Sequence, residues 1–170
     1  MIKQDILENQ VKLIYLGIGS NLGNKRNNIE KTKFELGQNN IKILRSSSFY
    51  ESLSWPNPKN PKFLNIVLKI ATNFTLSGLL KKCKEIEKNI GRKKSAINSP
   101  RVCDIDIIDY ENKIINSEII LPHPRMHNRS FVLLPLFELN KDWKHPVSNH
   151  NIKTLIFSLP NKDIRSIKQI

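Results

Sequence analysis

The chain has 170 residues, 39% of them hydrophobic, and a formal net charge of +13 at pH 7. The apolar share excludes a disordered chain, and the length suffices for one domain with its own core. No run of eighteen apolar residues occurs, so we expect no membrane span and no membrane partner. Two cysteines are too few for a disulfide scaffold and predict free thiols in a reducing cytoplasm. Residues 1–11 should form a short polar extension and residues 12–170 a single domain.

The positive charge alone would point to nucleic acid as a partner. However, only seven of the 28 basic residues are arginine, and lysine, asparagine and isoleucine are abundant throughout, which indicates a compositional bias. Lysine is tolerated widely on a solvated surface, whereas the planar fork of arginine suits sites that grip phosphate at two points. The positions of the arginines therefore carry more weight than the total charge.

Apolar and β-branched runs predict four main strands and a short edge hairpin. We expect the strands over residues 12–18, 41–50, 63–72 and 104–110, and the hairpin near residues 114–115. Two long loops accompany them. One, residues 51–61, holds three prolines within six residues, and the other, residues 92–99, is basic. Functional residues concentrate on such loops.

Helical spacing and capping residues predict two helices between these strands. The first is polar and should end near Leu36 because of Gly37, and the second should run from a Thr75 cap to Ile90 and end at Gly91. Two further helices are expected downstream, one over residues 131–139 with Pro135 at or near its start, and a short one near residues 154–157. The order βαββαβ predicts an α+β, ferredoxin-like fold: an antiparallel sheet with helices packed on it, and a C-terminal helical extension.

Asp104 and Asp106 are the most informative residues of the chain. On a strand, side chains at i and i+2 share a face roughly 7 Å apart, so both carboxylates should project together while Cys103, Ile105 and Ile107 face a core. Two solvated aspartates on a plain strand would be the simpler interpretation, although aspartate is disfavoured in strands. Because like charges this close repel, the pair favours a magnesium site that carries a polyphosphate.

Arg92 and Arg101 bracket the basic loop beside this pair. Cations after a helix C-terminus are common without any function, which accounts for Arg92 and the lysines that follow it. It does not account for Arg101 next to two aspartates, and the residues alone leave a solvated loop and a lid over a triphosphate equally open. Glu87 borders the apolar stripe of its helix, where it either pairs with Lys84 or orients an arginine or ligand.

Asn65 interrupts an apolar strand, and a buried amide needs hydrogen-bonding partners that a heterocyclic ligand could supply. Phe63 or Phe131 could stack on such a ring. His123 stands between two prolines, which argues against a helical zinc pair with His127 and leaves a polar contact to phosphate open.

Together these residues resemble the 6-hydroxymethyl-7,8-dihydropterin pyrophosphokinase family of folate synthesis over about residues 15–157. The segments that carry the resemblance are Tyr15–Gly23, Ser47–Ser52, Phe63–Asn65, Ile86-Glu87 with Gly91-Arg92, Pro100-Arg101 with Asp104–Asp106, and Pro122–Met126 with Asn128–Phe131. The resemblance implies a monomeric enzyme with three mobile loops that transfers pyrophosphate from MgATP to the pterin hydroxymethyl group and releases AMP.

The resemblance also implies roles for individual residues. Asp104 and Asp106 would bind two Mg²⁺ ions, and Arg92 and Arg101 would stabilise charge that moves toward AMP. ATP would also be contacted by Lys84, Glu87, Lys94, Arg101, His123 and Arg129. The pterin pocket would consist of Ser52, Leu53, Trp55, Phe63, Asn65 and Phe131.

The chain departs from the family pattern at several positions. Ile97 and Asn98 stand where the family usually has an arginine and a tryptophan, Lys84 replaces a glutamine, Lys94 an arginine and Phe63 a tyrosine. Two other function classes are compatible with a basic α+β domain. A ferredoxin-like RNA-binding module would need an aromatic platform, which the predicted strands lack. Another metal-dependent nucleotidyl or phosphoryl transferase would not need the Asn65–Phe131 pocket.

Overall fold

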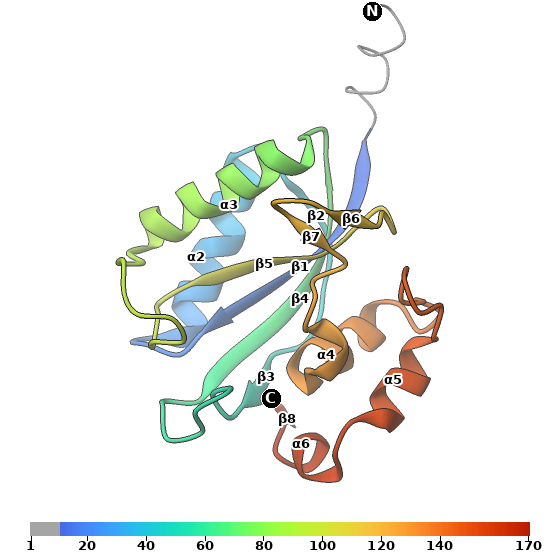
Figure 1. The fold of residues 1–170 in the computed structure, drawn as a ribbon. Coiled ribbons are helices and arrows are strands. Elements are labelled where there is room, and N and C mark those ends of the chain that lie inside the picture. Colours follow the sequence, from blue (N-terminus) through green and yellow to red (C-terminus); the bar gives the residue numbers. More distant parts are fainter. Residues whose placement is uncertain (1–10) are drawn as a thin grey trace, which may run out of the picture.

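The computed structural model describes residues 11–170, so the predicted extension lies, apart from Val11, outside the described residues. Its core follows the predicted βαββαβ order, with every pairing antiparallel. The elements of this core are β1 (Lys12–Ser20), α2 (Lys25–Gln38), β2 (Lys42–Ser46), β3 (Tyr50–Ser52), β4 (Phe63–Thr72), α3 (Leu76–Ile90) and β5 (Asp104–Tyr110). With the C-terminal strand β8 (Lys168–Gln169), the strands run in the order β5-β1-β4-β3-β8, and β2 also pairs with β4, which confirms the ferredoxin-like prediction (Figure 1).

The rest of the chain forms the predicted C-terminal extension and small edge strands. These elements are β6 (Ile115–Asn116), β7 (Ile120–Leu121), a 3₁₀ turn (Met126–Asn128), α4 (Ser130–Leu139), α5 (Ile152–Ser158), α6 (Asn161–Arg165) and β8 (Lys168–Gln169). No helix among residues 11–170 is both long enough and apolar enough to span a bilayer.

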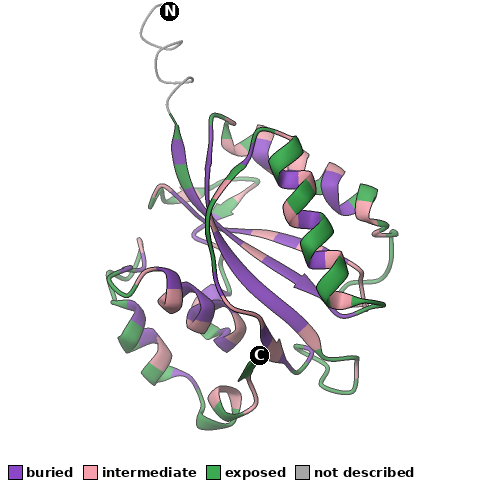
Figure 2. Cartoon of the chain, turned by 180° about the vertical axis from the view of Figure 1, so that it is seen from behind, coloured by how far each residue is buried: buried purple, intermediate pink, exposed green. Residues whose placement is uncertain are grey.

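Helices cover both faces of the sheet. One face packs on α2 and α3 through a core that includes Leu16, Ile66 and Ile105, and the other packs on α4 and α5 through Val67 and Ile108. The central strands β1, β4 and β5 are accordingly mostly buried, while the outer faces of the helices are exposed (Figure 2). Bases need an open sheet face for stacking, so this double cover disfavours the RNA-binding alternative.

The helix α3 forms as its sequence predicts. The Thr75 side chain caps its N-terminus by accepting a hydrogen bond from the Gly78 amide at 3.2 Å. Its buried stripe includes Leu79, Cys83 and Ile86. Gly91 then adopts a φ of 106°, a left-handed conformation that suits glycine and ends the helix.

Three local predictions were wrong. Gly37 does not end α2, which continues to Gln38, because Asn40 takes the left-handed φ of 58° instead. The strand expected over residues 41–50 is broken at residues 47–49, because the Ser47 hydroxyl accepts the Val67 amide in place of a backbone carbonyl. Pro135 lies inside α4 rather than at its start, since the helix begins at Ser130 and is held by burial of its apolar side chains.

Candidate active site

A cavity of about 460 Å³ lies on the sheet face that carries α4, at the edge where β1 ends and β5 begins. The strand register places Gly19 opposite both Asp104 and Asn65, and Gly17 opposite Asp106. Because these glycines have no side chain, the sheet is hollow between the aspartates and the amide. A Cβ at Gly19 would stand only 3.1 Å from Asn65 Oδ1 and 3.2 Å from a Phe63 ring carbon.

Most of the predicted site residues line this cavity. They are Ser52, Leu53, Trp55, Phe63, Asn65, Lys84, Arg92, Lys94, Arg101, Asp104, Asp106, Arg129 and Phe131. Glu87 and His123 are not in its wall. Seven cationic but only two anionic side chains line it, which suits a polyanionic ligand.

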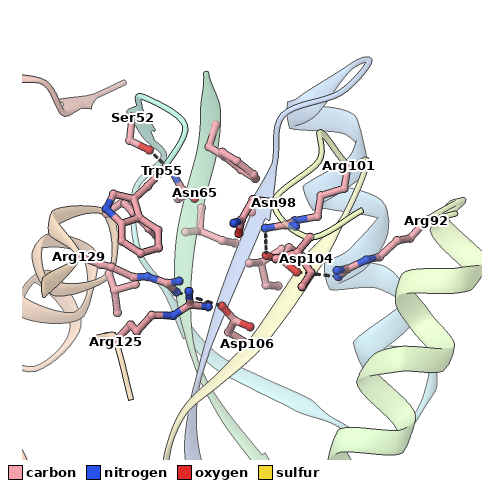
Figure 3. A pocket seen from close by; sticks show the side chains of 18 of the residues that line it. Ser52, Trp55, Asn65, Arg92, Asn98, Arg101, Asp104, Asp106, Arg125 and Arg129 are labelled. Atoms are coloured by element: carbon pink, nitrogen blue, oxygen red, sulfur yellow. Dashed lines mark hydrogen bonds and ion pairs between the residues drawn. The ribbon is translucent and has the colours of Figure 1, made fainter. Parts of the chain in front are cut away.

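The strand alternation predicted for the aspartates is confirmed. Cys103, Ile105 and Ile107 are buried in the core against α2 and α3, while Asp104 and Asp106 both face the cavity from the opposite side of β5 (Figure 3). Both cysteines are free and buried, also as predicted, and burial raises the pKa of the Cys83 thiol to about 12.

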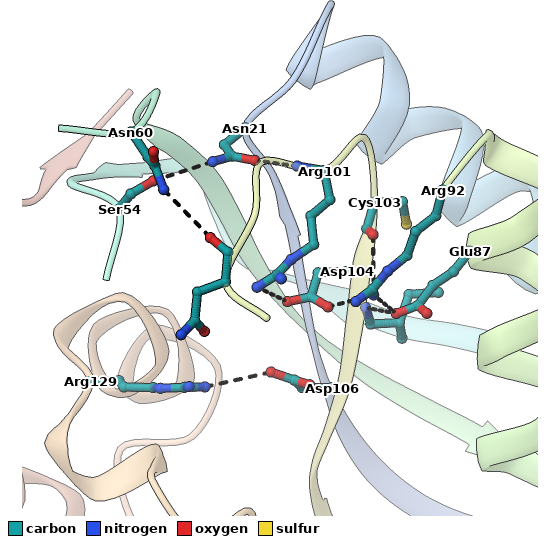
Figure 4. Close-up of polar contacts among 12 residues, drawn as sticks. Asn21, Ser54, Asn60, Glu87, Arg92, Arg101, Cys103, Asp104, Asp106 and Arg129 are labelled. Atoms are coloured by element: carbon teal, nitrogen blue, oxygen red, sulfur yellow. Dashed lines mark hydrogen bonds and ion pairs between the residues drawn. The ribbon is translucent and has the colours of Figure 1, made fainter. Parts of the chain in front are cut away.

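Asp104 is held by two arginines. Arg92 Nη1 lies 2.6 Å from one carboxylate oxygen and Arg101 Nη2 lies 3.0 Å from the other. Arg92 is itself anchored by Glu87 at 2.6 Å, and Glu87 also accepts the Ile105 amide at 2.8 Å (Figure 4). Since Glu87 is only 2% exposed, its place is behind Arg92, and Lys84 at 3.0 Å completes its partners.

Asp106 has looser contacts than Asp104. Arg129 Nη1 lies 3.5 Å and His123 Nε2 3.7 Å from the same carboxylate oxygen. Burial is the main cause that lowers the pKa of His123, and it outweighs the opposite effect of Asp106. Asp106 is therefore the more accessible of the two carboxylates, with 35% of its side chain exposed against 20% for Asp104.

Aromatic rings flank the arginines on one side of the cavity. The Arg129 guanidinium lies 5.4 Å from the ring centroids of both Trp55 and Phe131. Arg125, also 5.4 Å from Trp55, lines the cavity as well, although the sequence reasoning gave it no role. Arg125 lies in the Pro122–Met126 segment that resembles the family, and this was the sequence feature that could have indicated a role for it.

Asn65 has the polar surroundings that its sequence position required. Its Nδ2 donates to Ser52 Oγ at 3.0 Å and to the Tyr50 carbonyl at 3.4 Å, and the residue is buried. No residue in the described part of the chain donates to its Oδ1, so this acceptor can serve a ligand. Ser52, Asn65 and Phe131 thus form a pocket with one polar edge and one aromatic wall.

Asn21 joins the loops around the cavity, and sequence reasoning missed it. Its Nδ2 donates to Ser54 Oγ at 3.2 Å and to the Pro61 carbonyl at 3.1 Å, while its Oδ1 accepts the Arg101 amide at 2.7 Å (Figure 4). The residue is almost fully buried. One side-chain amide thereby links the turn after β1 to the proline-rich loop and to Arg101, just after the basic loop.

The donor set fits magnesium with phosphate better than a metal bound by protein alone. Residues 11–170 contain no cluster of three or more histidine, cysteine or acidic side chains that could hold a metal. Magnesium usually takes one or two carboxylates and completes its shell with water and substrate phosphate, which the Asp104–Asp106 pair allows. Arg101 Nε and Arg129 Nε are buried donors with no partner among the described residues, which fits phosphate oxygens as ligand acceptors.

The fold and the site together define an α+β protein with a carboxylate pair and an arginine-rich cavity, as in phosphate-transferring enzymes. Residues 15–141 match the family described as 7,8-dihydro-6-hydroxymethylpterin-pyrophosphokinase (HPPK). The chain belongs to this family.

Named relatives agree with this assignment. The chain is 36% identical over 141 residues to the 2-amino-4-hydroxy-6-hydroxymethyldihydropteridine pyrophosphokinase of Aquifex aeolicus, covering 82% of this chain and 88% of that protein. It is 39% identical over 155 residues to the folic acid synthesis protein fol1 of Pneumocystis carinii, covering 91% of this chain but only 21% of that protein. The chain thus spans about a fifth of the length of the fungal relatives.

Solved structures show the same fold. A Plasmodium falciparum HPPK-DHPS structure aligns with a TM-score of 0.71 at 18% identity, covering 95% of this chain and 48% of that chain. A second, with bound pteroate, aligns with a TM-score of 0.67 at 16% identity, covering 86% of this chain and 44% of that chain.

Proposed function

We propose that this chain transfers the diphosphate of ATP to the hydroxymethyl group of 6-hydroxymethyl-7,8-dihydropterin and releases AMP, as a step of folate biosynthesis. The observation that carries the proposal is the meeting, in one cavity, of a carboxylate pair, an arginine cluster and the Asn65 pocket. The names of the family and of its relatives supply the substrate. A monomer in the cytoplasm, with no nucleic-acid or membrane partner, completes the proposal.

The pterin would occupy the pocket beside Trp55. Asn65 and Ser52 would bind the polar edge of the ring, and Phe131 and Phe63 would pack against its faces. Phe63, which replaces the tyrosine usual in the family, contributes no hydroxyl, so polar recognition would depend more heavily on the amide of Asn65.

The polyphosphate would lie over the two aspartates. An in-line phosphoryl transfer depends on positioning and on neutralising charge, and little covalent chemistry is left to the protein. Arg92, fixed by Glu87, and Arg101, fixed by Phe63 at 5.6 Å and by Asn21, would offset charge that moves toward AMP. Lys84 and Lys94 also line the cavity and add positive charge.

Asp104 and Asp106 would hold magnesium, with two ions as the proposed number. Bound magnesium neutralises phosphate charge and lowers the pKa of an attacking hydroxyl. To bind magnesium, Asp104 would have to share its oxygens between the ion and Arg92 and Arg101. Asp106 would lose only its longer contact with Arg129.

The proposal is tested by measuring AMP release from MgATP with and without the hydroxymethyl pterin. We expect pterin-dependent AMP, and a loss of at least about 100-fold in turnover for Asp106→Asn, since electrostatic stabilisation of this kind contributes that much. Asp142→Asn removes an exposed carboxylate outside the cavity and should leave turnover unchanged. AMP release that does not depend on the pterin, or equal turnover of the two variants, would contradict the proposal.

A further inference from the structure

Arg125 differs from the other arginines of the cavity in having no ion pair. Arg92 and Arg101 pair with Asp104, and Arg129 pairs with Asp106. Within residues 11–170, no carboxylate pairs with Arg125, although its side chain is exposed at the cavity. An incoming anion must share the other three arginines with existing partners, but it can bind Arg125 without displacing any.

Trp55 holds this arginine in place. Its ring lies 5.4 Å from the guanidinium of Arg125 and equally far from that of Arg129, and Arg129 also contacts Phe131 (Figure 3). Cation–π contacts of this kind orient a guanidinium while leaving its N–H groups free to donate. Trp55 comes from the proline-rich loop, so the loop and the arginines are joined directly.

The two adjacent guanidinium groups also create an excess of positive charge. Asp106, at 3.5 Å from Arg129, partly neutralises this positive charge. Burial lowers the pKa of Arg129, and the charge of Arg125 lowers it further against the opposite effect of Asp106. A group with two or more negative charges would relieve this repulsion.

The arrangement also indicates which end of the cavity this anion occupies. Arg92 and Arg101 lie at Asp104, whereas Arg125, Arg129 and Trp55 lie on the other side of the aspartates (Figure 3). Phe131, which contacts Arg129, belongs to the wall of the Asn65 pocket. Arg125 therefore stands on the side where the proposed acceptor binds.

We propose that Arg125 binds the diphosphate group on the acceptor side of the aspartates, and that Trp55 is a positioning residue that orients Arg125 and Arg129 for it. The inference rests on the proposed function for the identity of the molecule that carries the diphosphate. The anion itself can be tested separately, with inorganic pyrophosphate.

Calorimetric titration of the full chain with magnesium pyrophosphate tests Arg125 directly. Arg125→Ala should weaken binding about tenfold, as expected for loss of a charged hydrogen bond. Arg26→Ala is the matched control, because Arg26 is also exposed over an aromatic ring, 4.2 Å from the centroid of Phe49, but lies outside the cavity. Equal affinity of Arg125→Ala and the parent chain, or no binding by the parent chain, would overturn the inference.

Two further titrations locate the diphosphate. With the pterin diphosphate product, Arg125→Ala should lose more affinity than with a non-hydrolysable ATP analogue. A larger loss with the ATP analogue would overturn the placement on the acceptor side. Failure of the parent chain to release AMP would instead contradict the proposed function. In that case the pyrophosphate titration would still test whether Arg125 binds the anion.

The role of Trp55 is tested by its replacements. Trp55→Phe keeps an aromatic face and should retain pyrophosphate affinity, whereas Trp55→Leu should weaken it about threefold at an unchanged melting temperature. The loss caused by Trp55→Leu should shrink in the Arg125→Ala background, because the two act on the same anion. Equal affinities for the phenylalanine and leucine variants would overturn the positioning role.

Discussion

Asp104 and Asp106 stand two residues apart on one strand, yet their surroundings differ. Both oxygens of Asp104 are engaged by arginines at 2.6 and 3.0 Å, whereas Asp106 has only contacts of 3.5 and 3.7 Å. The charge-assisted hydrogen bond from Arg92 is short and therefore strong, and with the ion pair to Arg101 it holds this carboxylate in place before any ligand binds. Asp106 is freer to turn toward a cation.

Gly19 keeps open the space between Asn65 and Phe63, and this gives a prediction at the residue scale. Gly19→Ala would place a Cβ 3.1 Å from Asn65 Oδ1 and should weaken pterin binding roughly tenfold, as overpacking does. Gly37→Ala on α2 is the control, because its Cβ would meet nothing within 4 Å and it lies outside the cavity. Calorimetric titration with the pterin measures both, and equal affinities would refute the role of Gly19.

Some site residues could be predicted from the sequence and others could not. The aspartate pair follows from strand alternation alone, and Asn65 is conspicuous because it interrupts an apolar run. Asn21 and Arg125 acquire their roles from distant partners, since Asn21 bonds residues 33 to 80 positions away and Trp55 lies 70 positions from Arg125. Such contacts depend on the fold, and no local pattern encodes them.

At the scale of elements, α3 and β5 are joined by one buried carboxylate. Glu87 on α3 accepts the backbone amide of Ile105 on β5 and also anchors Arg92 just after the helix. The helix therefore fixes both the strand that carries the aspartates and the arginine that meets Asp104. Its apolar periodicity predicted the helix correctly but placed Glu87 only at the edge of the stripe.

Replacing Glu87 should affect stability and activity together. Glu87→Gln removes the buried negative charge that pairs with Arg92. It should lower the free energy of unfolding by about 2 kcal/mol and also lower turnover. Glu85→Gln on the same helix breaks a solvent-screened pair with Lys82 and should change the free energy of unfolding far less than Glu87→Gln does. Urea denaturation compares the two variants, and similar losses would show that the buried network adds nothing.

The break between β2 and β3 shows why element boundaries are harder to predict than elements. The run over residues 41–50 is suitable for one continuous strand. However, Glu138 on α4 accepts hydrogen bonds from the Ser48 amide and hydroxyl and from the Tyr50 hydroxyl, all within 3.1 Å. A partner some 90 residues away thereby bends the chain, and β3 is free to carry Ser52 to the pocket.

At the scale of the whole molecule, the C-terminal third supports the site from the second face of the sheet. Trp143 donates its indole N–H to Asp109 at 2.7 Å, three residues beyond Asp106 on β5, and Asn140 donates to Tyr15 on β1 at 3.1 Å. The apolar run over residues 131–139 predicted that this region contains a helix. Its attachment to β5 depends on buried polar pairs that the sequence does not reveal.

His145 should make this region sensitive to acid. Its Nδ1 accepts the amides of Val147 and Ser148, and burial, then the nearby His127 and His150, lower its pKa. The unfolded chain therefore binds the proton more readily. The stability that neutral His145 contributes is complete above pH about 6.5 and is lost as the pH falls from there toward the folded pKa.

Urea denaturation at pH 7.5 and pH 5.5 measures this loss. His145→Asn offers a comparable acceptor that does not titrate, so the variant should lose less stability between the two pH values than the parent chain. Burial raises the pKa of Asp109, which acts in the opposite direction, but Asp109 is present in both chains and cancels in the comparison. Equal losses in the two chains would exclude His145 as the titrating group.

The central claim is that the carboxylates, the arginines and the Asn65 pocket act together to move a diphosphate from ATP to a pterin. A single-turnover reaction with ATP labelled at the γ-phosphorus tests it most directly, because the label follows whatever group is transferred. The account predicts that the label appears on the pterin as AMP forms in equal amount. Label released as orthophosphate, or accompanied by ADP in place of AMP, would contradict it.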